Sequence, residues 1–135
     1  MNKFFVYGTL KVGGFFAEAF DELRTECKNA KLKGFDLFKI GGGSSSWFPG
    51  IIKGKGEVIG ELHAYNKDYI KEVFANMDAI EGYNEKDPAR SLYRREKAVV
   101  ELEDGSTEEA NVYIFNNKMP KEFPKIESGI WPIKN

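Results

Sequence analysis

The hydrophobic pattern along the first half of the chain predicts strands. Residues 4–7 form a short apolar run that Gly8 ends, which is typical of a strand buried on both faces. Residues 31–40 alternate imperfectly between apolar and polar positions, and residues 49–53 and 57–65 continue this pattern on either side of a Gly-Lys-Gly turn. We therefore expect a strand in each of these segments.

The last third of the chain predicts a hairpin followed by an irregular segment. Residues 93–103 and 108–115 are rich in β-prone side chains and flank Asp104 and Gly105, a pair that tolerates the positive φ angles of a tight turn. From Asn116 onward, prolines interrupt any regular pattern. We expect this last segment to cover the rest of the domain without forming a helix or strand.

Two segments have helical spacing instead. Phe16, Phe20 and Leu23 recur at helical intervals, and Cys27 extends this pattern as a small core residue. Residues 67–81 form the clearest helix of the chain. About six strands and two helices, without the regular alternation of strand and helix that a parallel sheet requires, predict an α+β domain.

The bulk composition fits one domain and excludes several classes of function. Residues 1–135 match the usual length of a single domain, and 41% apolar with 14% aromatic residues can form a core. The 20 Lys and Arg residues nearly balance the 21 Asp and Glu residues, so no strongly basic face is expected for nucleic-acid binding. No apolar run approaches the ~20 residues of a membrane span, and the N-terminus leads into a strand rather than a signal peptide. We expect a cytoplasmic protein without nucleic-acid or membrane partners.

The chain has one cysteine, Cys27, and one histidine, His63, which argues against thiol and metal chemistry. A single cysteine cannot form an internal disulfide, and one residue of each type is too few for a dedicated nitrogen and sulfur metal site. His63 lies among the alternating residues of an expected strand, so a structural or surface histidine is the simpler interpretation than a catalytic one. We expect no metal and no cofactor.

Glu81 occupies a position that suggests chemistry. On a helix of about 100° per residue, it falls near the middle of the apolar stripe made by Ile70, Val73, Phe74, Met77 and Ile80. Gly82 is a natural helix end, which places Glu81 at the negative end of the helix dipole, and Asp78 lies one turn earlier. Apolar surroundings, the dipole and a like charge each raise the pKa of a carboxyl, as general acid–base chemistry near neutrality requires. Alternatively, the last turn frays and Glu81 simply reaches solvent.

Two separated motifs resemble those of a known family. Residues 5–11 read FVYGTLK and match the Tyr-Gly-(Ser/Thr)-Leu segment that opens γ-glutamylcyclotransferase-like (AIG2-like) domains. Residues 77–83 read MDAIEGY and resemble the Asp-x-(Ile/Leu)-Glu-Gly segment that carries the catalytic glutamate of this family. Shorter matches are Pro-Gly-Ile at 49–51, Gly-Glu-Leu at 60–62, Tyr-Arg-Arg at 93–95 and Ser-Gly-Ile-Trp at 128–131. Val12 and the spacing of the last motif depart from the common pattern, which affects the choice of substrate more than the chemistry.

The resemblance implies a fold and a set of binding residues. The implied fold is a small mixed β-barrel of about six strands with flanking helices. The implied binding site holds a γ-glutamyl group largely through the backbone amides of a loop, and amides exposed after a strand are a suitable anion site on physical grounds as well. The substrate-binding residues carried over in this way are Tyr7, Gly8, Thr9 and Leu10, with Tyr83 beside the pocket.

The resemblance also implies a reaction that needs no protein nucleophile. The α-amine of the substrate attacks its own γ-amide carbonyl, releasing 5-oxoproline and an amine, amino acid or peptide. Glu81 takes a proton from the α-ammonium and gives one to the leaving nitrogen. The partner is therefore a small γ-glutamyl compound, no cofactor takes part, and we expect a monomer or homodimer.

Two other functions remain open at the level of sequence. The pocket could bind a small γ-glutamyl-like or anionic ligand without turnover, or the same scaffold could carry a different acyl-transfer reaction. Glu81 favours an enzyme, because a buried carboxylate would weaken the binding of an anion beside it.

Overall fold

The computed structural model describes residues 2–14, 16–41 and 47–131. The strands are β1 (Lys3–Val6), β2 (Arg24–Ile40), β3 (Phe48–Tyr65), β4 (Tyr93–Leu102) and β5 (Thr107–Phe115). The helix is α1 (Ile70–Glu81), and short 3-10 turns occur at η1 (Ala17–Phe20), η2 (Lys67–Tyr69) and η3 (Pro88–Arg90).

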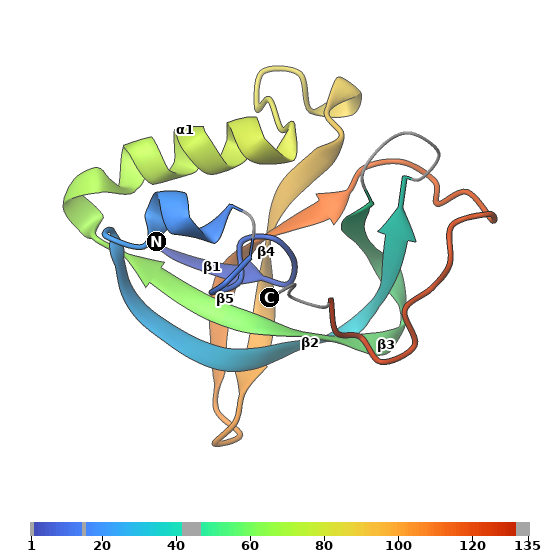
Figure 1. Ribbon diagram of the computed structural model, residues 1–135, viewed down its shortest axis with the longest axis horizontal. Coiled ribbons are helices and arrows are strands. Elements are labelled where there is room, and N and C mark those ends of the chain that lie inside the picture. The colour runs from blue at the N-terminus through green and yellow to red at the C-terminus, as the bar shows by residue number, and fades with distance from the viewer. Residues whose placement is uncertain (1, 15, 42–46, 132–135) are drawn as a thin grey trace.

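The strands close into a small mixed barrel in the order β1-β3-β2-β4-β5 (Figure 1). Neighbouring strands are antiparallel except β1 and β5, which run parallel and close the barrel where Phe4 pairs with Asn111. The α+β barrel that the resemblance implied is thus confirmed, with five strands where about six were expected.

The strand count differs because residues 49–53 and 57–65 belong to one continuous strand, β3. The glycines between them serve close packing rather than a turn. A Cβ on Gly54 would lie 2.0 Å from Asp36 Oδ2, and the Gly56 N–H donates to Asp36 Oδ1 at 2.9 Å. The Asp36 side chain on β2 therefore lies against β3 where only glycines leave room for it.

The helix expected through Phe16 and Cys27 is wrong. Only the 3-10 turn η1 forms, and β2 begins at Arg24, opposite Tyr65. Cys27 lies on β2 opposite His63 and is exposed, so the expectation of a core cysteine is wrong as well. Pairing with the long β3 supplies backbone hydrogen-bond partners along this segment, and that gain outweighs a weak helical spacing.

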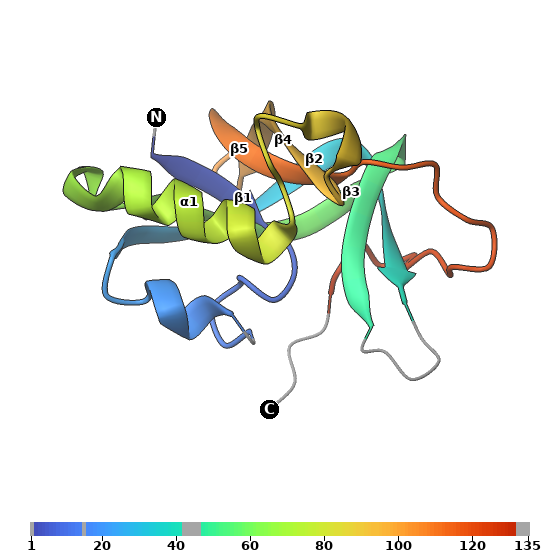
Figure 2. The same cartoon turned by 90° about the horizontal axis from the view of Figure 1, so that it is seen from above.

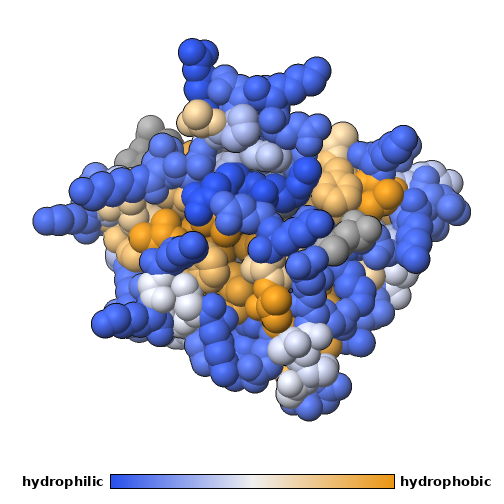
Figure 3. All heavy atoms as spheres, turned by 180° about the vertical axis from the view of Figure 1, so that it is seen from behind, coloured by the Kyte–Doolittle hydropathy of each residue, from blue (hydrophilic) through white to orange (hydrophobic). Residues whose placement is uncertain are grey.

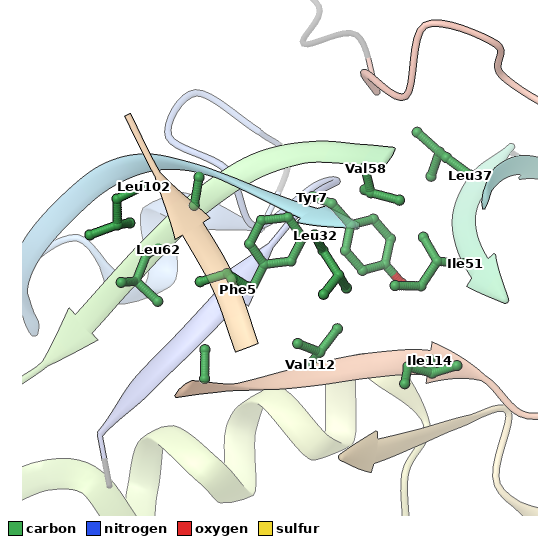
Figure 4. Close-up of a cluster of buried hydrophobic side chains, with 13 residues drawn as sticks. Phe5, Tyr7, Leu32, Leu37, Ile51, Val58, Leu62, Leu102, Val112 and Ile114 are labelled. Carbon is green, nitrogen blue, oxygen red and sulfur yellow. The ribbon is translucent and has the colours of Figure 1, made fainter. Parts of the chain in front are cut away.

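Apolar side chains are buried in two layers, one on each side of the barrel wall. The inner layer fills the barrel and includes Phe5, Leu62 and Val112 (Figure 4). The outer layer lies between the wall and α1 and includes Phe4 of β1, together with Val73 and Met77 of the helix. Burial on both faces of β1 confirms the strand expected from its unbroken apolar run.

Helix α1 lies beside β1 on the outside of the barrel (Figures 1 and 2). It ends at Glu81 in a Schellman motif. Gly82 takes a φ of 67°, the Tyr83 N–H donates to the Asp78 carbonyl at 2.9 Å, and the Gly82 N–H donates to the Ala79 carbonyl at 3.4 Å. The helix and its glycine end are thus confirmed, and the last turn is hydrogen-bonded rather than frayed.

The hairpin and the irregular C-terminal segment are also confirmed. Gly105 has a φ of 86° in the turn between β4 and β5. Between β5 and residue 131, where the description of the chain ends, the segment forms only isolated bridges, from Lys125 to Phe38 and from Ile130 to Ile59. On the face opposite to the view of Figure 1, hydrophobic patches lie between hydrophilic residues (Figure 3). None of the helices in the described ranges is long and apolar enough to cross a membrane.

Candidate active site

The loop after β1 is held in shape by its own backbone and by one carboxylate. The Lys11 N–H donates to the Gly8 carbonyl at 3.0 Å, and the Gly14 N–H donates to the Lys11 carbonyl at 2.7 Å. The Val12 N–H donates to Glu61 Oε1 at 2.9 Å, which ties the loop to β3. The loop is therefore held by hydrogen bonds within its own backbone and by the bond from Val12 to β3.

Several N–H groups of this loop have no hydrogen-bond acceptor among the residues that the structure describes. Within the described ranges, the backbone amides of Gly8, Thr9 and Leu10 donate no hydrogen bond. All three residues line a cavity. Gly8 packs against Pro49, where an added Cβ would lie 2.4 Å from the proline Cγ, so the backbone approaches closely there. Unpaired amides at one edge of a cavity are available to an anionic group.

Glu81 lies on the wall of the same cavity, at the end of α1. Its side chain is partly exposed because it faces the cavity, yet apolar and aromatic groups surround the carboxyl. No residue of the described chain hydrogen-bonds it. Burial raises the pKa of Glu81 from 4.5 to about 7. The acid can therefore be both protonated and ionised near neutral pH.

Asp78 does not contribute to this raised pKa as the sequence suggested. Its carboxylate receives hydrogen bonds from Arg95 Nη1 at 2.6 Å and from the Tyr113 hydroxyl at 2.5 Å. Arg95 balances the charge of Asp78, and burial is the cause of the shift at Glu81. Asp78 instead attaches the last turns of α1 to β4 and β5.

The cavity encloses about 1090 Å³ and brings together most of the predicted site residues. Tyr7 contributes to its wall, but the Tyr7 side chain points into the barrel core (Figure 4) and its hydroxyl donates to the Tyr113 carbonyl at 2.6 Å. Tyr83 is not among the lining residues. Its ring lies beneath the Arg95 guanidinium, with 5.2 Å between the guanidinium carbon and the ring centroid. The structure therefore groups Glu81 with the loop but leaves Tyr83 outside the cavity.

Several lining residues were not predicted as site residues. Lys39 and Phe48 reach the cavity because the pairing of β2 with β3 extends to Ile40 and Phe48, and Trp47 lies one residue before this end of β3. No local pattern indicates this arrangement. Tyr93 and Trp131 also line it. Both belong to the shorter motifs of the resemblance, and that signal could have marked them as site residues.

Cys27, Glu61 and His63 come together on β2 and β3, although sequence reasoning argued against a metal site. Their ligand atoms lie within 4.8 Å of one another. His63 Nε2 lies 2.9 Å from Glu61 Oε1, and Nδ1 accepts a hydrogen bond from Arg24 Nε at 3.3 Å. Because Nδ1 accepts, the ring proton lies on Nε2, where a metal ion would have to bind, and Arg24 adds positive charge. The fully buried His63 fits the structural alternative and not the surface one.

The fold and the site together define a small mixed β-barrel that carries an isolated acid beside a loop of unpaired amides. Comparison of the chain with models of known protein families identifies its family. The family model for "Gamma-glutamyl cyclotransferase, AIG2-like" matches residues 4–132, so the chain belongs to this family. Among curated proteins, none matches the chain in sequence.

Solved structures share the fold. An AIG2-like protein of mouse (Mus musculus) has a TM-score of 0.72 at 23% identity, with 94% of this chain and 86% of that chain covered. A protein of Arabidopsis thaliana has a TM-score of 0.66 at 27% identity, with coverage of 90% and 72%. A structure described as a gamma-glutamyl cyclotransferase has a TM-score of 0.58 at 18% identity, with coverage of 92% and 69%.

Proposed function

We propose that this protein is a cyclotransferase that releases 5-oxoproline from a γ-glutamyl amine, amino acid or peptide. The observation that supports the proposal most is the position of Glu81, a carboxyl with a pKa of about 7 on the wall of a cavity that also contains unpaired backbone amides. Family membership supports the same chemistry. The reaction needs a group that binds the substrate carboxylate and an acid–base group that is partly ionised near neutral pH, and the cavity contains candidates for both.

The loop amides orient the substrate. The α-carboxylate of the γ-glutamyl group accepts hydrogen bonds from the N–H groups of Gly8, Thr9 and Leu10. Fixing one end of the flexible glutamyl chain favours the conformer in which the α-nitrogen lies next to the γ-carbonyl carbon. Orientation of this kind can lower a ring-closing barrier by several kcal/mol, with an upper range of about 7–11 kcal/mol.

Glu81 moves the protons. In its ionised form it accepts a proton from the α-ammonium, which frees the nitrogen lone pair for attack on the γ-carbonyl carbon. The new carbon–nitrogen bond closes the five-membered lactam, and the bond to the leaving nitrogen breaks. Protonated Glu81 gives this proton to the leaving nitrogen. The ring nitrogen then loses its second proton to the ionised Glu81, which passes it to the departing amine, so that the lactam keeps one N–H and the amine leaves as an ammonium ion. The two products together contain the atoms of the substrate, so no water, metal or other cofactor is consumed.

A pKa near 7 suits both halves of this cycle. A carboxyl with an ordinary pKa would be a weak base toward an ammonium group and would be a poor acid source at neutral pH, because little of it is protonated. Burial in the apolar wall strengthens the base and retains the proton for the second half.

A panel of γ-glutamyl compounds tests the proposal. Purified protein is incubated with γ-glutamyl amines, amino acids and peptides, and 5-oxoproline is detected by mass spectrometry. The expected result is formation of 5-oxoproline together with an equal amount of the free amine, with and without chelator. Ligand binding without 5-oxoproline from any compound would instead support the binding module.

A further inference from the structure

The cavity extends beyond the loop and Glu81, and its outer part is apolar. The described ranges contain seven exposed large apolar side chains, and four of them line this cavity: Phe16, Trp47, Leu92 and Ile130. Exposed apolar side chains are ordinary when scattered, whereas a group of them around one opening marks a binding surface. The opening is therefore suited to an apolar part of the ligand.

Aromatic side chains connect the acid to this opening. Glu81 lies close enough to Tyr93 to raise the pKa of that phenol further. The Tyr93 ring meets Phe48 edge-on, with 6.5 Å between the ring centroids, and Trp47 immediately precedes Phe48 in the chain. A group that starts at Glu81 and extends outward therefore follows an aromatic wall.

The C-terminal segment supplies another wall and is fixed in place. The Ile126 N–H donates to the Leu37 carbonyl at 2.7 Å, and Lys11 Nζ donates to the Trp131 carbonyl at 2.6 Å. Both Ile126 and Trp131 line the cavity. Because these contacts form without a ligand, binding of an apolar group does not require the free-energy cost of ordering this wall.

Lys39 is the one charged lining residue other than Glu81 in the described ranges. Its Nζ lies 4.8 Å from the centroid of the Trp47 ring, at the apolar opening. No described carboxylate pairs with it. A ligand that bears both an apolar side chain and a carboxylate would satisfy this part of the cavity.

We infer that the outer part of the cavity is the leaving-group subsite and that it selects γ-glutamyl conjugates of amino acids with large aromatic or aliphatic side chains. Lys39 receives the carboxylate of the departing amino acid, and the aromatic wall receives its side chain. The inference rests on the proposed function and adds the identity of the amine. The bond from the γ-carbonyl carbon to this amino acid's nitrogen breaks as the lactam forms, and that nitrogen takes the proton from Glu81.

Specificity constants measure the preference. 5-Oxoproline formation is followed for γ-glutamylphenylalanine, γ-glutamylleucine, γ-glutamylalanine and γ-glutamylaspartate, which share the same scissile bond. We expect kcat/KM for the phenylalanine and leucine conjugates to exceed that for the alanine conjugate by about 10- to 100-fold, the scale of apolar discrimination in a pocket. Turnover with an equal or reversed order would overturn the inference and leave the proposed function intact. No 5-oxoproline from any conjugate would overturn the proposed function itself.

Two substitutions with a matched control test the same subsite. Trp47→Ala should lower kcat/KM for γ-glutamylphenylalanine about tenfold and change that for γ-glutamylalanine much less. Tyr69→Ala removes an exposed aromatic residue outside the cavity and should change neither. Lys39→Gln should cost about two- to fivefold with γ-glutamylphenylalanine and nothing with γ-glutamyl-phenethylamide, which lacks the carboxylate. The subsite would be contradicted if Trp47→Ala lowered kcat/KM equally for γ-glutamylphenylalanine and γ-glutamylalanine. It would also be contradicted if Lys39→Gln lowered kcat/KM equally for γ-glutamylphenylalanine and γ-glutamyl-phenethylamide.

Discussion

Replacing Glu81 by glutamine should make the protein more stable above neutral pH and give no such gain in acid. The folded protein holds the Glu81 pKa at about 7, whereas the unfolded chain returns it to about 4.5. Between these values the folded state binds more protons than the unfolded state. Stability therefore falls as pH rises from the unfolded to the folded pKa, and the loss is complete above both. Glutamine cannot ionise and does not suffer this loss.

The size of the effect follows from the two pKa values. A pKa raised from 4.5 to about 7 corresponds to about 3–4 kcal/mol, at roughly 1.4 kcal/mol for each pH unit. The side chain is partly exposed, and solvent screening lowers this figure to about 2–3 kcal/mol. The stability difference between Glu81→Gln and the unchanged protein should grow by that amount between pH 4 and pH 8, in favour of the variant.

Urea denaturation of both proteins at several pH values measures this difference, with slopes compared to confirm the same extent of unfolding. Glu122→Gln is the matched control, because Glu122 is exposed and forms no ion pair with a described residue. Its stability difference should change little with pH. A Glu81→Gln difference that is equally independent of pH would refute the raised pKa, and with it the argument that burial makes this acid reactive.

Three further predictions concern the surroundings of Glu81. 5-Oxoproline should raise the melting temperature of the unchanged protein by binding the loop, and Gly8→Ala should abolish this rise, because the added Cβ would meet Pro49 and displace the loop. A full shift in the variant would place the ligand elsewhere. Asp78→Asn should lower the free energy of unfolding by about 1–3 kcal/mol in urea denaturation. The pKa of Glu81, measured from the pH dependence of kcat, should not change; a marked fall of that pKa would mean that the charge of Asp78 contributes to it. Glu61→Gln should raise KM more than it lowers kcat, since it weakens the bond that holds the Val12 N–H and loosens the loop; an unchanged KM with a lower kcat would assign Glu61 a different role.

Sequence reasoning succeeded where short-range patterns decide the structure. The apolar stripe and Gly82 were sufficient to place α1 and to put Glu81 at its end, because helix periodicity and the glycine end act within a few residues. The same holds for β1 and for the turn at Gly105. The apolar surroundings expected for Glu81 were likewise visible in the stripe itself.

Sequence reasoning failed where distant segments meet. Arg95, which balances Asp78, comes from β4 and has no local relation to the helix, so the like-charge argument was wrong. The expected helix through Cys27 lost to pairing between β2 and β3, whose partners are far apart in the chain. Lys39 reaches the cavity through that same pairing, and Trp47 lies just before the paired end of β3, so the outer subsite could not be predicted from the spacing of residues.

The rate of 5-oxoproline formation by Glu81→Gln tests the role of Glu81 most directly. With the best γ-glutamyl substrate of the panel, the variant should stay folded and lose about 10²- to 10⁴-fold in kcat, the usual contribution of a general acid–base group. KM should change less, because the amide keeps the shape of the site. A folded variant that forms 5-oxoproline within a few-fold of the rate of the unchanged protein would contradict the assignment of Glu81 as the group that moves the protons.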